Sequence, residues 1–295
     1  MQANERQETQ HRLPPWFKVR MPGGPNFIQL RNLLRSSELH TVCEDAHCPN
    51  VGNCWERGTA TFMILGDICT RACRYCAVTS GRPLGVDLEE PDRLAWTVER
   101  LGLSYCVITS VNRDDLPDGG AFIFAQCVTK VRQRMPDTKV ETLIPDFKGQ
   151  GLKTMVRARP NVLNHNIETV RRVFHGVRPK GSYDYSLELL RQVKEIDSTM
   201  VTKSGMMVGL GETWDEILAT MADLRAVGCD LLTIGQYLRP SERHARIERF
   251  YTPQEFAQLR DEGMGMGFRH VAAGPLVRSS YHADEQHSAA SLALA

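Results

Sequence analysis

The sequence predicts an α/β fold in which a parallel sheet forms a partial, open (β/α)6 barrel. Short apolar segments typical of buried strands alternate with amphipathic helical segments six times in succession. Such alternation favours a parallel sheet with right-handed crossovers, and eight units would close a complete barrel. The length of 295 residues suits one large barrel of this kind. We therefore expect an N-terminal extension (1–57), a barrel (58–268) and a C-terminal closing segment (269–295).

The first half of the chain shows the alternation clearly. A helical pattern over residues 27–39 precedes the barrel, and residues 1–26, rich in Pro and Gly, are expected to form a mobile arm. The apolar run "TATFMILGD" predicts the first buried strand, and "PDRLAWTVERLG" has the periodicity of a helix. The elements expected up to the middle of the chain are strands 59–67, 105–111, 139–146 and 162–168 and helices 91–102, 121–135 and 151–159.

The second half repeats the pattern with clear helix starts. Capping boxes pair Thr213 with Glu216 and Thr252 with Glu255, Pro253 suits the first helical position, and Gly228 ends a helix. The tail after Tyr281 is expected to be weakly ordered. The elements expected here are strands 201–211 and 231–238 and helices 186–197, 213–228 and 252–267.

Charge and composition exclude several classes of protein. The 36 basic and 35 acidic residues give a net charge of +1, without the basic excess usual in nucleic-acid binders. No apolar run reaches the length of a membrane span. The N-terminus lacks the apolar core of a secretory signal, and Glu5 and Glu8 argue against a transit peptide. We expect a cytoplasmic location, where nine cysteines serve as ligands or core residues instead of disulfides.

A compact group of cysteines follows the first predicted strand. Cys69, Cys73 and Cys76, the second triplet, have the spacing C-x3-C-x2-C, with Tyr75 beside the last cysteine. A structural zinc site normally takes four protein ligands, whereas three thiolates suit a 4Fe–4S cluster with one iron left open. The pattern favours the cluster, and zinc or a chance grouping remains the alternative.

Another group of cysteines precedes the barrel. Cys43, Cys48 and Cys54, the first triplet, have the spacing C-x4-C-x5-C and imply a second cluster that again lacks one cysteine ligand. The other cysteines are expected to be small buried core residues. These are Cys106, Cys127 and Cys229.

The motif C-x3-C-x-Y-C in this context resembles the radical S-adenosylmethionine (SAM) superfamily. The two triplets followed by "RSSY" (278–281) resemble the lipoyl synthase family within it, as do "PPWFKVRMPGG", "TSVNRDDLPDGGA", "ETLIPDFKG", "NHNIETV" and "MVGLGET". The resemblance implies two 4Fe–4S clusters and two SAM molecules per turnover. It also implies that two sulfur atoms are inserted at C6 and C8 of an octanoyl group that is amide-linked to a lysine of a carrier protein. The cluster at the first triplet, called the auxiliary cluster, would be the source of the sulfur.

The same resemblance assigns roles to individual residues. Ser280, with Ser279 as second choice, would ligate the auxiliary cluster together with the first triplet, and Arg278 could anchor the tail. The turn "GLGE" would contact adenine and ribose through Gly209 and Gly211. Cofactor contacts are further expected from Tyr75, Asn112, Asn166, Glu168, Arg178 and Lys203.

Other polar residues at strand ends have weaker signals. Arg113, Asp114, Asp115 and Asn164 could equally be solvated or hydrogen-bonded loop residues, and His165 is expected to position its neighbours and not to bind metal. The same alternative applies to Asn112, Asn166, Glu168, Arg178, Lys203 and Arg278.

The implied partners are an octanoylated lipoyl carrier domain or H protein, a low-potential electron donor such as flavodoxin or ferredoxin, and an iron–sulfur carrier protein. Three alternatives stay open. Sulfur insertion into another alkyl substrate, as in biotin synthase, is disfavoured by the first triplet. A two-cluster electron carrier is disfavoured by the large barrel. The third is a zinc-binding structural protein.

Overall fold

A computed structural model describes residues 13–19, 22–46, 48–57 and 59–292 of the chain. Its strands form one eight-stranded sheet in which spatial order follows sequence order. The first pair is antiparallel and all the others are parallel. The strands are β1 (His40–Thr41), β2 (Thr61–Ile64), β3 (Tyr105–Ser110), β4 (Lys139–Leu143), β5 (Val162–Asn164), β6 (Val201–Val208), β7 (Leu231–Gln236) and β8 (His270–Gly274).

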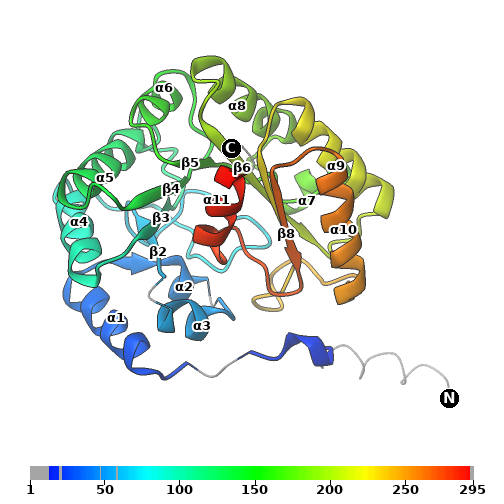
Figure 1. The fold of residues 1–295 in the computed structure, drawn as a ribbon, viewed down its shortest axis with the longest axis horizontal. Helices are drawn as coiled ribbons and strands as arrows, with labels where there is room; N and C mark the ends of the chain where they lie inside the picture. The colour runs from blue at the N-terminus through cyan, green and yellow to red at the C-terminus, as the bar shows by residue number, and fades with distance from the viewer. Residues whose placement is uncertain (1–12, 20–21, 47, 58, 293–295) are drawn as a thin grey trace.

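The sheet curves into a barrel that no hydrogen-bonded strand pair closes between β8 and β1, in the part of the chain that the structure describes. Most helices surround the outside of the sheet, and one lies across its middle (Figure 1). The helices are the 3-10 turn η2 (Pro15–Phe17), α1 (Pro25–Ser36), α2 (Val42–Asp45), α3 (Val51–Glu56), α4 (Glu90–Leu101), α5 (Ala121–Arg134), α6 (Gly149–Arg157), α7 (Arg171–Val177), α8 (Tyr183–Ile196), α9 (Trp214–Ala226), α10 (Pro253–Gly265) and α11 (Ala283–Leu292).

The predicted (β/α)6 unit is confirmed, because the six expected strands correspond to β2–β7. The expected capping boxes are also present at the starts of α9 and α10. Cys106, Cys127 and Cys229 are fully buried, as expected for core residues. Apolar side chains on the outer face of the sheet pack against the surrounding helices and form two large core clusters.

Two expectations for the chain ends need correction. The described part of the tail after Tyr281, residues 282–292, is not the weakly ordered segment that we expected, because α11 runs to Leu292 and buries Ala283 against Tyr105 and Val107 of β3. The strand β8 lies within the expected closing segment and extends the sheet, although its short Gly- and Ala-rich sequence gave no clear strand pattern. Of the expected mobile arm, residues 1–12 and 20–21 lie outside the described residues, and Phe17 packs on the ring of Phe250.

The interior of the barrel contains a polar floor. Successive strand residues point to opposite faces, so Lys203 on β6 and Glu141 on β4 both point inward. Lys203 Nζ lies 2.9 Å from Glu141 Oε1, and both side chains are buried. Tyr105 and Asn164 also donate hydrogen bonds to Glu141. The helix α11 packs beside this pair on the inner wall, at the strand β3.

The segment between β8 and α11, residues 275–282, contains the "RSSY" sequence and is called the RSSY loop below. It runs very close to β7, where a Cβ atom on Gly235 would lie 2.1 Å from the backbone oxygen of Val277. A side chain at position 235 therefore cannot coexist with the observed path of the loop.

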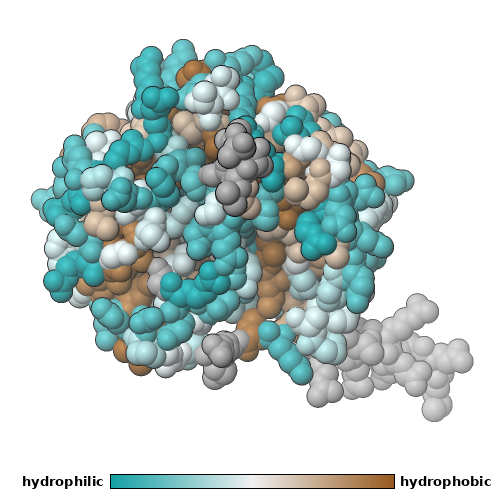
Figure 2. Space-filling view, viewed as in Figure 1, coloured by the Kyte–Doolittle hydropathy of each residue, from teal (hydrophilic) through white to brown (hydrophobic). Residues whose placement is uncertain are grey.

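No helix among the described residues is long and apolar enough to cross a membrane. Hydrophilic residues cover most of the face seen in Figure 2, and apolar residues lie recessed between them.

We predict that Gly235→Ala displaces the RSSY loop, because its Cβ atom collides with backbone and not with a flexible side chain. Overpacking of this kind costs roughly 1–3 kcal/mol. Thermal unfolding should show a lower Tm, and limited proteolysis should cut more readily near residues 275–282. Gly265→Ala is the matched control, since its Cβ atom would meet nothing within 4 Å. Equal behaviour of the two variants would contradict the prediction.

Candidate functional site

The carboxyl ends of the parallel strands surround a cavity of about 570 Å³. Both cysteine triplets line it, although they come from separate segments of the chain. Arg278, Ser279, Ser280 and Tyr281 of the RSSY loop line the same cavity. The fold therefore brings all six predicted ligand cysteines and both candidate serines to one place.

The first triplet is held by two short helices before the barrel. Cys43 lies in α2, whose N-cap Thr41 accepts a hydrogen bond from the Glu44 backbone, and Cys54 lies in α3. Burial raises the pKa of the Cys43 thiol to about 11. Burial and the neighbouring Cys43 and Cys48 raise the pKa of Cys54 to about 12. These thiols favour the neutral form by themselves, so their ionisation requires a strongly positive partner such as iron.

The second triplet lies in the loop after β2, and backbone groups orient its sulfur atoms. The backbone N–H groups of Arg71 and Asn112 donate to Cys69 Sγ at 3.4 Å and 3.3 Å. Burial raises the pKa of the Cys76 thiol to about 12. Donors directed at a sulfur atom stabilise its thiolate form, which is the form that binds iron.

Both triplets fit iron–sulfur ligation by donor chemistry and position. Among the described residues, no three His, Cys, Asp or Glu side chains lie close enough to hold one metal ion together. In a 4Fe–4S cluster each cysteine binds its own iron, so the sulfur atoms of a triplet need not converge on one point.

The RSSY loop is anchored to the first triplet's helices and to the barrel. Asn50 Nδ2 donates to the Leu276 backbone oxygen at 2.6 Å, and Asn53 Nδ2 donates to the Tyr281 hydroxyl at 3.3 Å. Ser279 Oγ donates to Asn166 Oδ1 at 3.0 Å. The Ser280 hydroxyl has no hydrogen-bond partner within the described ranges, although it lines the cavity.

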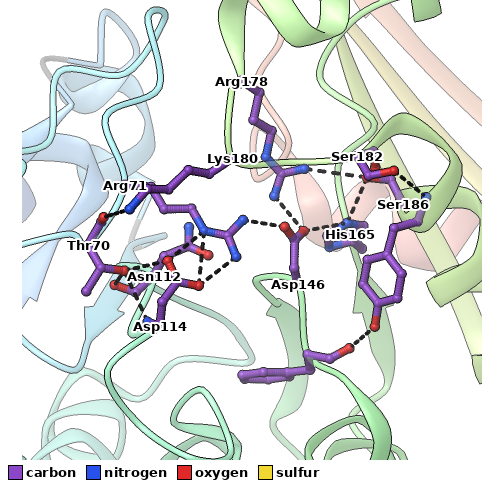
Figure 3. A network of polar contacts seen from close by, with 12 residues as sticks. Thr70, Arg71, Asn112, Asp114, Asp146, His165, Arg178, Lys180, Ser182 and Ser186 are labelled. Atoms are coloured by element: carbon purple, nitrogen blue, oxygen red, sulfur yellow. Dashed lines mark hydrogen bonds and ion pairs between the residues drawn. The ribbon is translucent and has the colours of Figure 1, made fainter.

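A buried carboxylate connects the second triplet's loop to the barrel. Asp146 follows β4, and it pairs with Arg71, with Arg178 at 2.7 Å and with His165 at 3.4 Å (Figure 3). Arg71 also pairs with Asp114 at 2.7 Å. Burial opposes ionisation of Asp146, yet these cationic and imidazole neighbours hold its pKa below the usual value.

The ring of His165 is held in place by hydrogen bonds. Its Nδ1 lies 3.0 Å from the Ile144 backbone oxygen and its Nε2 lies 3.3 Å from Ser186 Oγ. Burial lowers the pKa of His165 to about 4, so the ring is neutral near pH 7. These contacts agree with the predicted positioning role.

A second polar group lies on the wall formed by β5 and β6. Glu168 hydrogen-bonds with the side chains of Tyr75 and Asn166, and burial raises its pKa. Its φ angle of 67° is left-handed, a strained conformation for a residue with a side chain. Backbone hydrogen bonds with Gly205 and Met207 hold this conformation. Such strain is often found at functional sites, which supports the prediction for Glu168.

Several predicted contacts do not reach the cavity wall. Lys203 pairs with Glu141 in the barrel floor, because it lies early in β6 and far from the carboxyl end. Gly209 and Gly211 adopt positive φ angles, and the turn is closed by Glu212, which accepts hydrogen bonds from the backbone of Gly209 and Leu210. Tyr75, Asn112, Asn166, Glu168 and Arg178 do line the cavity.

Sequence reasoning missed three residues that position the site. Arg71 and Asp146 form the ion pair described above, and the ring of His244 lies 2.9 Å from the Cys76 backbone oxygen through Nε2. Arg71 lies between Cys69 and Cys73, and Asp146 is the last residue of a predicted strand, so their places in the sequence could have indicated that both lie near the site. His244 carried none, because the loop after β7 is brought to the cysteines only by folding.

Comparisons with known proteins agree with this geometry. A family model described as the radical SAM superfamily matches residues 63–224, and one described as the N-terminal domain of lipoyl synthase of that family matches residues 2–48. The lipoyl synthase of Rubrobacter xylanophilus is 56% identical over 278 residues, covering 94% of this chain and 87% of that protein. The lipoyl synthase of Thiobacillus denitrificans is 54% identical over 286 residues, covering 96% and 92%.

Solved structures share the fold at low sequence identity. Methylornithine synthase has a TM-score of 0.56 and 15% identity, covering 81% of this chain and 73% of that chain. The FeFe-hydrogenase maturase HydG from Carboxydothermus hydrogenoformans has a TM-score of 0.55 and 14% identity, covering 87% and 66%. At such identity the likeness concerns the fold alone.

We predict that Asp146→Asn lowers the free energy of unfolding by about 3–5 kcal/mol, because it leaves Arg178 buried without its aspartate partner and leaves Arg71 with only the more exposed Asp114. Asp114→Asn is the matched control, since Asp114 also pairs with Arg71 but is 41% exposed. The free energy of unfolding of Asp114→Asn should fall by about 1 kcal/mol or less, because an exposed ion pair contributes little to stability. The thermal unfolding midpoints of the two variants check this, and a larger loss for Asp114→Asn would refute it.

Proposed function

Since this chain belongs to the lipoyl synthase family of radical SAM enzymes, we propose that it inserts two sulfur atoms at C6 and C8 of an octanoyl group carried on a protein lysine. The observation that carries the proposal is the shared cavity, where two cysteine triplets and the RSSY loop meet. A sulfur source and a radical source must both reach one acyl chain, and a single cavity lined by both sets of ligands permits this.

A 4Fe–4S cluster and SAM supply, when bound, a carbon radical able to abstract hydrogen from an unactivated carbon, and an auxiliary cluster supplies sulfur. Such carbons have no acidic proton, so general acid–base catalysis by side chains is insufficient. The radical SAM family implies the first cluster and SAM. The auxiliary cluster at the first triplet is part of our proposal.

The second triplet would hold the cluster that binds SAM. Arg71 lies within this loop, and its ion pair with Asp146 fixes the loop against β4. The backbone N–H of Asn112 then orients Cys69 from the neighbouring strand end. Rigid support of this kind is required because a small displacement of reacting groups lowers the rate greatly.

Polar groups on the opposite wall would position the methionine and ribose parts of SAM. Glu168 and Asn166 present a carboxylate and an amide to the cavity, beside Tyr75 and Arg178. The turn containing Gly209 and Gly211 would act through the residues it supports, such as Gln236. Gln236 is one of the residues that line the cavity. A Cβ atom on Gly209 would lie 2.0 Å from Gln236 Nε2, so the turn packs directly against this side chain.

The first triplet and Ser280 would hold the auxiliary cluster. The Ser280 hydroxyl is available for a ligand, whereas the Ser279 hydroxyl is engaged by Asn166. A hard serine oxygen pairs less well with iron–sulfur chemistry than a soft thiolate. This ligand would let one corner of the cluster open when sulfur is removed.

The cavity also suits the acyl substrate. The apolar residues Met63, Val111, Ile144 and Met207 are among those that line it. An octanoyl chain can bury its methylene groups there, each of which contributes about 0.8 kcal/mol. We expect the carrier to be an octanoylated lipoyl domain or H protein, with a flavodoxin or ferredoxin as electron donor and an iron–sulfur carrier protein for rebuilding the cluster.

The direct test is anaerobic incubation of the reconstituted protein with SAM, a reductant and an octanoyl-lysine peptide. We expect the peptide mass to increase by two sulfur atoms for the dithiol formed under reducing conditions, and by two sulfur atoms less two hydrogen atoms after oxidation to the cyclic disulfide. Formation of 5′-deoxyadenosine without any sulfur in the peptide would contradict the proposed substrate.

The two triplets should have separable roles. Replacing Cys69, Cys73 and Cys76 together by alanine should abolish reductive cleavage of SAM, whereas replacing Cys43, Cys48 and Cys54 should leave cleavage measurable and stop sulfur insertion. Each variant should retain about four irons per chain and the unaltered protein about eight, by iron and sulfide analysis. Lipoyl product from the variant of the first triplet would show that its cluster is not the sulfur donor.

Replacement of Ser280 should impair sulfur transfer selectively. Ser280→Ala should preserve 5′-deoxyadenosine formation while lipoyl formation falls, because the second triplet is unaltered. Ser280→Cys should also be impaired, since a fourth thiolate would release iron less readily. Ser279→Ala is the control, and it should lose only the hydrogen bond to Asn166. Full lipoyl formation by both Ser280 variants would exclude the assigned role.

A further inference from the structure

Arg278 lines the cavity without a carboxylate partner among the described residues. The lining arginines Arg71 and Arg178 pair with Asp146, whereas Arg239, which also lacks a carboxylate, donates to the backbone oxygens of Glu242 and His244. The only hydrogen bond of the Arg278 side chain within the described residues goes from Nη1 to the neighbouring Val277 backbone oxygen, at 2.7 Å. A guanidinium has several more N–H donors, and leaving its charge without an anion in a protein interior is costly.

The Arg278 side chain lies beside the first triplet. It lines the cavity that the triplet lines, and its charge interacts with Cys48. Its Nη1 atom would lie 3.2 Å from a Cβ atom on Gly235, so glycine at that position leaves room for the guanidinium. The ionisable group that interacts with the Arg278 charge is therefore the Cys48 thiol and not a carboxylate.

The backbone on both sides of Arg278 is fixed. Asn50, between Cys48 and Cys54, holds the Leu276 backbone oxygen, and Ser279 is held by Asn166. These contacts keep the loop, and with it Arg278, at the cavity. The same anchors place Ser280, the proposed iron ligand, two residues further along.

We propose that Arg278 is the electrostatic partner of the cluster held by Cys43, Cys48 and Cys54, and that this pairing locks the RSSY loop over the cavity. The inference rests on the proposed function and deepens it. A cluster bound by thiolates and a serine oxygen is an anion overall, and guanidinium N–H groups bind anions by charge-assisted hydrogen bonds. Arg278 is thus a positioning residue whose favourable charge interaction exists while the cluster is intact.

The consequence is coupling between the cluster and the loop. Consumption of the cluster removes the counter-charge of Arg278, so the locked position of the RSSY loop becomes less stable. Opening of this loop would expose the first triplet for rebuilding. The fold supplies the path, because the loop leads from the edge strand β8 to contacts with Asn50 and Asn53 in the N-terminal extension, at the two ends of the open sheet.

The test uses the protein in which Cys69, Cys73 and Cys76 are replaced by alanine, so that only the auxiliary cluster is present. In this background we compare Arg278→Gln, which removes the charge, with Arg278→Lys, which retains it. Tyr281→Phe is the control: it removes the hydroxyl that accepts a hydrogen bond from Asn53 Nδ2 at 3.3 Å, so it weakens the anchoring of the loop without changing any charge. The readouts are the rate of iron loss to a chelator, the midpoint potential of the cluster, and hydrogen exchange of residues 276–281.

We expect Arg278→Gln to lose iron about tenfold to a hundredfold faster, the change expected when a hydrogen bond to a charged group is lost. Its midpoint potential should become more negative, because a nearby positive charge favours the reduced, more anionic state. Arg278→Lys should recover most of both effects. Tyr281→Phe should leave the potential unchanged, which separates charge pairing from simple anchoring.

Hydrogen exchange tests the locking. In the background protein, residues 276–281 should exchange more slowly with the cluster than without it, and Arg278→Gln should abolish that difference. The inference would be overturned if the proteins with arginine, lysine or glutamine at position 278 had equal midpoint potentials and equal rates of iron loss. Failure of the background protein itself to bind about four irons would instead overturn the proposed auxiliary cluster, so the two failures are distinguishable.

Discussion

The open side of the barrel is the constraint on which the rest of the structure depends. Strands β1 and β8 do not pair, so the sheet alone cannot enclose a cavity. The chain fills the opening with its own C-terminal part, which packs α11 on the inner wall and lays the RSSY loop over the carboxyl ends of the strands. The two ends of the sequence therefore complete a site that the central (β/α) units only begin.

The contacts between these ends are polar and specific. Asn50 and Asn53 of the N-terminal extension bind the RSSY loop, and Arg57 pairs with Glu285 of α11. Such hydrogen bonds each contribute about 1 kcal/mol, far less than a packed apolar core. This part of the fold is thus suited to opening and closing while the barrel remains intact.

The interior charges divide the barrel into a floor and a reaction space. Lys203 and Glu141 satisfy each other below the cavity, and Asp146 organises the charges at its side. A buried charge is tolerated only when it is paired. These ion pairs therefore neutralise the charges that lie below and beside the cavity. The remaining polar groups, such as Glu168, face the cavity where SAM and substrate are expected.

The sequence by itself determined the repeated strand–helix order, the ends of α9 and α10 and the grouping of cysteines into two triplets, because these depend on local periodicity, capping and spacing. It predicted some of the polar residues that line the cavity, such as Asn112, Asn166 and Glu168, through their places at strand ends. It could not assign β8 or α11, whose short or weakly patterned sequences are stabilised by packing on β7 and β3. It also placed Lys203 at the cofactor, although the register of β6 puts that side chain in the barrel floor. Only the tertiary structure decided that Asp146 pairs with Arg71 and that His244 contacts the Cys76 backbone. It also decided that Arg278 lines the same cavity as the first triplet. These residues are far apart in the chain, so their contacts depend on how the loops at the strand ends pack together.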